Sequence, residues 1–141
     1  MSGFLLDTNV LSEFARAQAA DQRVDRWLQA TPEETLFASV LTFAEIRRGI
    51  ELLPVSKRRT QLEDWQDDLQ RSFASRLLPV TQAIGDRWAV LSAQAQRRGT
   101  PLAIIDGLIA ATAFEHDLTV VTRNVKDFAG LGVLLFNPWE G

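Results

Sequence analysis

The sequence predicts an α/β fold with three layers, in which helices cover both faces of a mainly parallel sheet of four or five strands. Two observations lead to this prediction. Short apolar segments recur without the polar alternation of a half-exposed strand, and segments with helical spacing of apolar residues separate them. The length of 141 residues suits one domain, and 46% hydrophobic with 23% charged residues is a globular composition. Residues 1–141 are therefore expected to form a single domain.

The expected strands are short apolar runs, at residues 3–6, 36–40, 77–80, 118–122 and 133–136. The first, Phe-Leu-Leu, shows the pattern of a strand that is covered on both faces. Pro79 indicates that the third run lies at an edge of the sheet, because proline has no N–H to donate to a neighbouring strand.

Helices are expected between these strands, at residues 9–16, 19–29, 42–53, 56–73, 82–98 and 102–115. Pro54 ends the third. The fourth is strongly charged with a narrow apolar stripe, so most of it should face water or a partner. Thr81 is expected to cap the fifth and Gly99 to stop it. The sixth should begin with Thr100 as cap and Pro101 in the first turn, and it should be buried because it is apolar almost all round.

Composition excludes several classes of chemistry. The chain has no cysteine and a single histidine, His116, which argues against disulfides, zinc sites and Ser-His-Asp catalysis. A net charge of −3 argues against binding nucleic acid by overall charge, although it allows a local basic rim around an acidic, metal-filled site. The N-terminus does not resemble a signal peptide, and no apolar run approaches the roughly 20 residues of a bilayer span. A cytoplasmic protein without a membrane partner is expected.

The first strand leads directly into Asp7, Thr8 and Asn9. Open α/β sheets place their ligands at the carboxyl ends of the strands, which is where Asp7 should lie. A carboxylate at that position is either the cap of the following helix or a reactive group.

For four further polar residues, too, the sequence allows either a structural or a reactive role. Asp106 lies in an apolar helix, and burying a bare carboxylate costs several kcal/mol, so it needs a partner beyond the helix N-terminus. Glu45 follows Thr42 by three residues, the spacing of a capping box, but the start of its helix should also lie at the edge that carries Asp7. Asn124 and Asp127 follow the fourth strand and are common turn residues.

These side chains are expected to meet, because parallel strands end at one edge of the sheet and each following helix begins there. Clustered carboxylates repel one another, which raises their pKa values unless a cation neutralises them. Carboxylates favour hard cations such as Mg²⁺ or Mn²⁺. The residues alone thus indicate a Mg²⁺- or Mn²⁺-dependent phosphodiesterase or phosphatase.

Five segments form a pattern that spans the chain: residues 6–10 (Leu-Asp-Thr-Asn-Val), 44–50 (Ala-Glu-Ile-Arg-Arg-Gly-Ile), 106–113 (Asp-Gly-Leu-Ile-Ala-Ala-Thr-Ala), 122–128 (Thr-Arg-Asn, then Asp-Phe) and 137–139 (Asn-Pro-Trp). Together they resemble the motifs of the PIN domain, specifically the VapC/FitB-type toxins of bacterial toxin–antitoxin pairs. The resemblance implies a PIN-like α/β/α fold and a metal-dependent endoribonuclease that blocks translation, with tRNA as one expected target. It also implies a cognate antitoxin protein, a homodimer, and a heterotetramer or larger assembly with the antitoxin.

The resemblance also implies roles for individual residues. Asp7, Glu45 and Asp106 match the family's acidic triad. Asp7 and Asp106 would hold the metal, with Glu45 as a further ligand or a base that orients water. At the fourth position the family often has an acid. Here either Asn124 is a neutral supporting ligand and Asp127 supplies the charge, or Asp127 only caps the next turn.

Two sets of side chains would support this chemistry. Thr8 would donate its hydroxyl to the carboxylates or to water. Four cations, Arg47, Arg48, Arg123 and Lys126, lie near the predicted site and would bind RNA phosphates, with solvated surface charge as the alternative interpretation. Two other functions remain open: a metal-dependent phosphatase on a small substrate, and a catalytically silent RNA-binding PIN domain.

Overall fold

Five parallel strands form one sheet in the structure of the chain, a computed structural model that describes residues 3–14 and 21–140. The strands are β1 (Phe4–Leu6), β2 (Leu36–Ser39), β3 (Leu77–Leu78), β4 (Thr119–Val121) and β5 (Leu135–Phe136). Their order is β3-β2-β1-β4-β5, and Phe4 of the central strand lies beside both Leu36 and Thr119. The predicted parallel sheet is confirmed, and β3, which precedes Pro79, lies at an edge as expected.

Six helices cover the sheet within the described residues: α1 (Thr8–Glu13), α2 (Gln22–Ala30), α3 (Val40–Glu51), α4 (Lys57–Ser72), α5 (Gln82–Arg97) and α6 (Ile104–His116). Short 3₁₀ helices are η2 (Glu33–Thr35), η3 (Ala74–Arg76) and η4 (Val125–Phe128). Residues 15–16 of the first predicted helix and 19–20 of the second lie outside the described residues. The other predicted helices are found, with differences at their ends.

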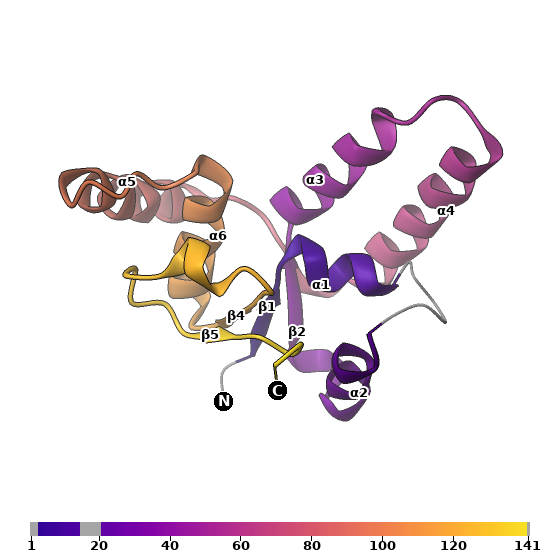
Figure 1. Cartoon of the computed structure of the whole chain (residues 1–141), viewed down its shortest axis with the longest axis horizontal. Coiled ribbons are helices and arrows are strands. Elements are labelled where there is room, and N and C mark those ends of the chain that lie inside the picture. The colour runs from indigo at the N-terminus through magenta and orange to yellow at the C-terminus, as the bar shows by residue number, and fades with distance from the viewer. Residues whose placement is uncertain (1–2, 15–20, 141) are drawn as a thin grey trace.

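The side chains of the strands alternate between two hydrophobic cores. Leu6 and Val121 belong to the core beneath α1 to α4, and Leu5 and Val120 to the core beneath α5 and α6. All four are fully buried, as expected of strands that are covered on both faces. Figure 1 shows the resulting layers, with α5 and α6 on one side of the sheet and α1 to α4 on the other. The predicted three-layer α/β/α architecture is therefore confirmed.

Two helices begin at residues other than those predicted. The third begins at Val40 rather than at residue 42, because the Ser39 hydroxyl accepts from the Leu41 N–H at 3.0 Å and caps it. The sixth begins at Ile104, so the prediction that Thr100 caps it is wrong: Thr100 instead donates both its N–H and its hydroxyl back to α5. In both cases the helix start remains at the carboxyl edge of the sheet.

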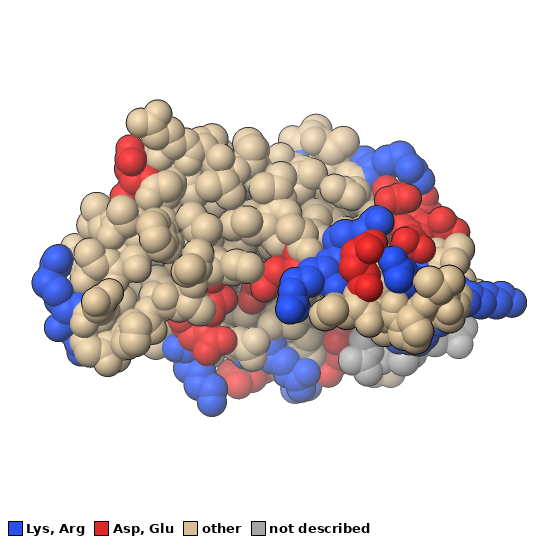
Figure 2. Space-filling model, turned by 90° about the horizontal axis from the view of Figure 1, so that it is seen from above, with Lys and Arg blue, Asp and Glu red and all other residues tan. Residues whose placement is uncertain are grey.

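The hairpin of α3 and α4 projects from the sheet and carries much of the surface charge. Arg47 pairs with Glu63 and Arg59 with Glu51 between these helices, and each arginine also pairs with a glutamate of its own helix. In Figure 2 the charged side chains gather over this hairpin, on the right, while uncharged side chains dominate the left and centre of the face. Within residues 3–14 and 21–140, no helix has the length and apolar character needed to cross a membrane.

Candidate active site

Asp7 lies at the carboxyl end of β1, immediately before α1, and its two carboxylate oxygens bind different elements. Oδ1 accepts a hydrogen bond from the Thr8 N–H at 2.9 Å, which caps α1. Oδ2 accepts one from the Thr122 hydroxyl, beyond β4, at 2.8 Å. Only 8% of the residue is exposed. Asp7 is therefore a helix cap, but capping accounts for one oxygen, and the other is held across the edge of the sheet.

Glu45 lies in the second turn of α3 and is held by α1. The Thr8 hydroxyl donates to Glu45 Oε1 at 2.7 Å. The capping-box interpretation is wrong, because α3 begins at Val40 and places Glu45 beyond the third position of the helix. A hydroxyl that donates to a carboxylate makes a strong hydrogen bond. Thr8 thus fixes the direction in which Glu45 points.

Asp106 lies in the first turn of α6 and is half-buried. Burial is the largest cause that raises its pKa, to about 6, and the negative charges of Asp7, Asp127 and Glu45 raise it further. All four predicted acids are therefore close enough to interact. They come from the end of β1, the starts of α3 and α6, and η4, which follows β4, and these elements meet at the carboxyl edge of the sheet (Figure 1).

Asn124 and Asp127 occupy different positions relative to these acids. The carboxylate of Asp127 acts on Asp106, and both residues line a recess of about 300 Å³. The backbone N–H of Asn124 donates to the Thr122 hydroxyl at 3.0 Å. Within residues 3–14 and 21–140 the Asn124 side-chain amide makes no hydrogen bond. Asp127 thus contributes charge to the site, while Asn124 orients the hydroxyl that holds Asp7.

The donor set suits a hard divalent cation. Four carboxylates supply oxygen donors, and their mutual repulsion at Asp106 is what a bound cation would relieve. Among the described residues, no three acidic or histidine side chains are close enough to hold one ion together. Mg²⁺ tolerates this arrangement, because it usually keeps several waters and takes only one or two carboxylates from the protein. The residues therefore fit a Mg²⁺ or Mn²⁺ ion held mainly through water.

Comparisons with known proteins agree with the fold and the motif order. A family model for the PIN domain matches residues 4–133. The chain belongs to the PIN domain family. This PIN domain is 40% identical to Toxin FitB of Neisseria gonorrhoeae, with 96% of this chain and 98% of that protein aligned. It is 39% identical to VapC ribonuclease Y4jK of Sinorhizobium fredii, with 96% and 97% aligned.

The chain is also similar in structure to a solved protein over nearly its whole length. The chain aligns with one in a crystal structure of FitAcB from Neisseria gonorrhoeae with a TM-score of 0.90 and 38% identity. The alignment covers 98% of this chain and 99% of that chain. The whole described fold, including the α3–α4 hairpin, therefore belongs to this type of PIN domain.

Thr122 is a site residue that the sequence did not single out. Its hydroxyl is buried, donates to Asp7 Oδ2 and accepts from the Asn124 N–H. Thr8 does the same for Glu45, so each of two carboxylates is held by a threonine hydroxyl that follows a strand. The position of Thr122 directly after an apolar strand was the available signal, but its partner lies 115 residues away.

We expect Thr122→Val to weaken both stability and activity of the PIN domain. Valine keeps the shape but leaves the buried Oδ2 of Asp7 without its donor, which costs about 1–3 kcal/mol of unfolding free energy. Urea unfolding measures the loss. Thr122→Ser keeps the hydroxyl and should retain most of the stability, so equal losses in both variants would contradict the hydrogen bond as the cause.

Gly107 lets α5 approach the helix that carries Asp106. A Cβ atom at this position would lie 2.8 Å from Trp88 Cδ1 and 3.0 Å from both Trp88 Nε1 and Leu102 Cδ2. Any side chain at residue 107 must therefore displace the indole or shift the first turn of α6. The distance between the two helices is thus fixed next to Asp106.

Alanine substitutions at two helical glycines should have opposite effects. Gly107→Ala should destabilise the protein by about 1–3 kcal/mol, because overpacking outweighs the gain in helix propensity. Gly49→Ala in α3 has nothing within 4 Å of its Cβ and should stabilise by about 0.5–1 kcal/mol. Chemical denaturation of both variants tests this, and a stabilised Gly107→Ala variant would show that the indole yields freely.

The three arginines predicted to bind RNA lie in different surroundings. The guanidinium of Arg47 pairs with Glu51 at 2.8 Å and with Glu63 at 3.8 Å. Arg123 lies over the ring of Trp139, with 5.2 Å from its Cζ atom to the ring centroid. Arg48 is exposed, and within the described residues its guanidinium has no ion pair or hydrogen bond. RNA would therefore have to compete with existing contacts at two of the three.

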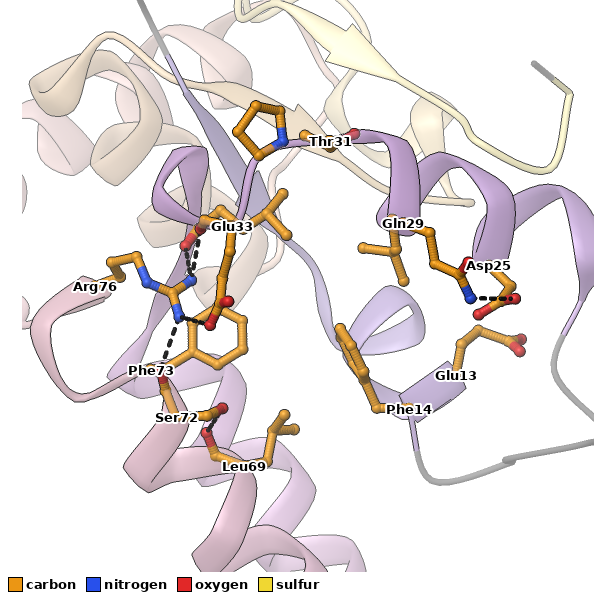
Figure 3. A pocket seen from close by; sticks show the side chains of 13 residues that line it. Glu13, Phe14, Asp25, Gln29, Thr31, Glu33, Leu69, Ser72, Phe73 and Arg76 are labelled. Atoms are coloured by element: carbon orange, nitrogen blue, oxygen red, sulfur yellow. Dashed lines mark hydrogen bonds and ion pairs between the residues drawn. The ribbon is translucent and has the colours of Figure 1, made fainter.

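A cavity of about 620 Å³ lies away from the acidic cluster, between α1, α2 and α4. Figure 3 shows Phe14, Leu69 and Phe73 on its apolar walls, with Glu13 and Asp25 at one side. Arg76 lies at the opposite side and bonds to Glu33. Its lining contains none of the four site acids, so this cavity has no part in the chemistry derived from them.

Proposed function

We propose that this PIN domain is a divalent-metal-dependent endoribonuclease and the toxin of a toxin–antitoxin pair. The observation that carries the proposal is the convergence of the acids on Asp106, whose pKa is raised to about 6 by burial and, in addition, by the charges of Asp7, Asp127 and Glu45. The names of its relatives, Toxin FitB and VapC ribonuclease Y4jK, support the same activity. The substrate we propose is RNA, with tRNA as the target class to examine first.

In this proposal Asp7 and Asp106 hold the cation, and Glu45 orients a water molecule, because no three acidic side chains of the described residues are close enough to share one ion. A bound Mg²⁺ or Mn²⁺ would lower the pKa of a water molecule and stabilise the charge that develops on the phosphate. Thr8 keeps Glu45 Oε1 directed at the site, and Thr122 does so for Asp7. Asp127 is the fourth acid and adds negative charge on the side of η4. These residues position the reacting groups before substrate arrives.

A cleavage assay on purified protein tests the activity. We expect RNA fragments with Mg²⁺ or Mn²⁺, none with EDTA, and none from Asp7→Asn. Cleavage that persists in Asp7→Asn would contradict the assigned site. Phosphate release from small phosphorylated compounds, without RNA cleavage, would instead indicate the phosphatase. RNA binding without either reaction would indicate a silent domain.

The proposed partners are an antitoxin, the RNA substrate and a second copy of the chain. Exposed apolar side chains at the carboxyl edge of the sheet favour association, with Val40 37%, Val80 40% and Ile104 65% exposed. Sedimentation at low concentration tests the dimer, and a monomer in the absence of antitoxin would contradict it. Relief of growth arrest by co-expression of the neighbouring gene's product tests the antitoxin.

A further inference from the structure

The recess of about 300 Å³ beside the acids lies between the end of α5, the segment before α6, and η4. Asp106 and Asp127 line one end of it, and Leu102 and Leu131 supply apolar lining. Arg98 and Lys126 also line it. The recess therefore combines part of the acidic site, an apolar surface and two cations.

The two cations belong to those in the described residues that form no ion pair, which also include Arg48 and Arg97. Arg47, Arg59 and Arg76 are committed to ion pairs, whereas Arg98 and Lys126 are exposed and form none within the described residues. Arg98 donates one long hydrogen bond, of 3.4 Å, to the Gly130 carbonyl, which leaves its other N–H groups free. Unpaired cations are what an acidic site needs nearby if it is to receive a polyanion.

The backbone at the recess also has free donors. Within residues 3–14 and 21–140 the N–H groups of Leu102 and Ala103 donate to no acceptor, since α6 begins only at Ile104. Exposed amides of this kind bind phosphate oxygens or the polar edges of bases. The apolar lining beside them suits the flat face of a base.

We propose that this recess binds the nucleotide next to the cleaved bond, with Arg98 and Lys126 on its phosphate and Leu102 and Leu131 against its base. The proposal rests on the proposed ribonuclease activity. It adds Arg98 as a position for substrate binding and assigns Lys126 to the same recess, whereas Arg47 and Arg48 belong to α3 and do not line it.

The test compares Arg98→Gln and Lys126→Gln with a matched control, Arg97→Gln, which removes the same charge from the neighbouring residue at the end of α5 but does not line the recess. The probe is a short, labelled single-stranded RNA of mixed sequence. We expect each recess variant to raise the KM for cleavage by about fivefold, with kcat within about twofold of wild type, and the control to change neither. Binding is measured in an Asp7→Asn background, where the slope of log affinity against log salt should fall by about 0.7 for each lost contact.

A further variant tests whether the substrate needs the volume of the recess. Ala129 is exposed and lines the recess, so Ala129→Phe should fill it without disturbing the core and raise KM in the same way. Recess variants that match Arg97→Gln in KM and salt slope, while wild type still cleaves RNA, would overturn the subsite alone. Wild-type protein that neither cleaves nor binds the RNA would overturn the proposed function together with the subsite.

Discussion

Asp106→Asn should abolish RNA cleavage and at the same time stabilise the metal-free protein. The loss of activity, at least about a hundredfold, follows from removing the carboxylate on which the other three acids converge. The gain in stability follows from removing a charge that burial and three like charges disfavour. Opposite effects on activity and stability are expected of a residue that is retained for function.

The pH dependence has a definite sign. The pKa of Asp106 is raised to about 6 in the folded protein, against about 3.9 in an unfolded chain. Between these values the folded state holds a proton that the unfolded state has released, so the unfolding free energy falls as pH rises from about 4 to about 6. Since Asp106 is only half-buried, we expect screening to limit the loss to about 1 kcal/mol.

Urea unfolding in EDTA at several pH values measures this pH-dependent part of the unfolding free energy. Asp106→Asn should exceed wild type at pH 8, and the difference should vanish below about pH 4. Asp64→Asn, at an exposed position of α4, is the matched control and should show no such dependence. Addition of Mn²⁺ should stabilise wild type and leave Asp106→Asn nearly unchanged. An Asp106→Asn variant less stable than wild type at pH 8 would contradict the crowding of charge at this site.

Arg76→Ala should cause the largest loss of stability among single arginine substitutions. The guanidinium donates to three backbone carbonyls, those of Glu33 at 3.0 Å, Leu36 at 2.6 Å and Ser72 at 2.7 Å. It also pairs with the Glu33 carboxylate and lies over the ring of Phe73, 4.6 Å from the centroid (Figure 3). Only 12% of the side chain is exposed. Truncation leaves these carbonyls without donors, and we expect a loss of about 3 kcal/mol.

Arg71→Ala is the matched control for this substitution. Arg71 lies near the end of α4, shortly before Arg76 in η3, and pairs with Asp68, but both side chains are more than 70% exposed. Its loss should change the unfolding free energy by less than about 0.5 kcal/mol. Thermal unfolding of the two variants at one pH compares them directly, and equal effects would mean that the Arg76 contacts are replaced by water at little cost.

The position of the acids at one edge of the sheet could be predicted, because it follows from short sequence patterns on either side of each acid. The apolar run Phe4–Leu6 predicts a buried strand that ends directly before Asp7. Asp106 is conspicuous because the rest of its helix is almost entirely apolar. Parallel strands and their following helices then bring these residues together without knowledge of any contact. This reasoning predicted that the four acids lie near one another, and the charges of Asp7, Asp127 and Glu45 do act on Asp106; their part in catalysis stays a prediction.

The sequence did not reveal which of several possible residues caps a helix, or which contacts join residues that are far apart in the chain. Thr42 and Thr100 both have the sequence signature of a cap, but Ser39 already caps α3, and Thr100 bonds back to α5. The pairing of Thr122 with Asp7 joins residues 115 apart, and nothing local indicates it. The partner of Arg47 was visible in principle, because Glu51 stands four residues on, the spacing of a helical ion pair.

The pairing of β1 with β4 also determines when the site forms during synthesis. Asp7 leaves the ribosome before its neighbour in the sheet, β4, and before the acid on η4, and Thr122 follows Asp7 by 115 residues. A nascent chain that stops before β4 has no Thr122 to hold Asp7 and no Asp127 beside Asp106. Long-range pairing of this kind forms late in folding. Products of translation that stops before β4 are therefore expected to be inert, because only chains that extend past η4 acquire the assembled carboxylates.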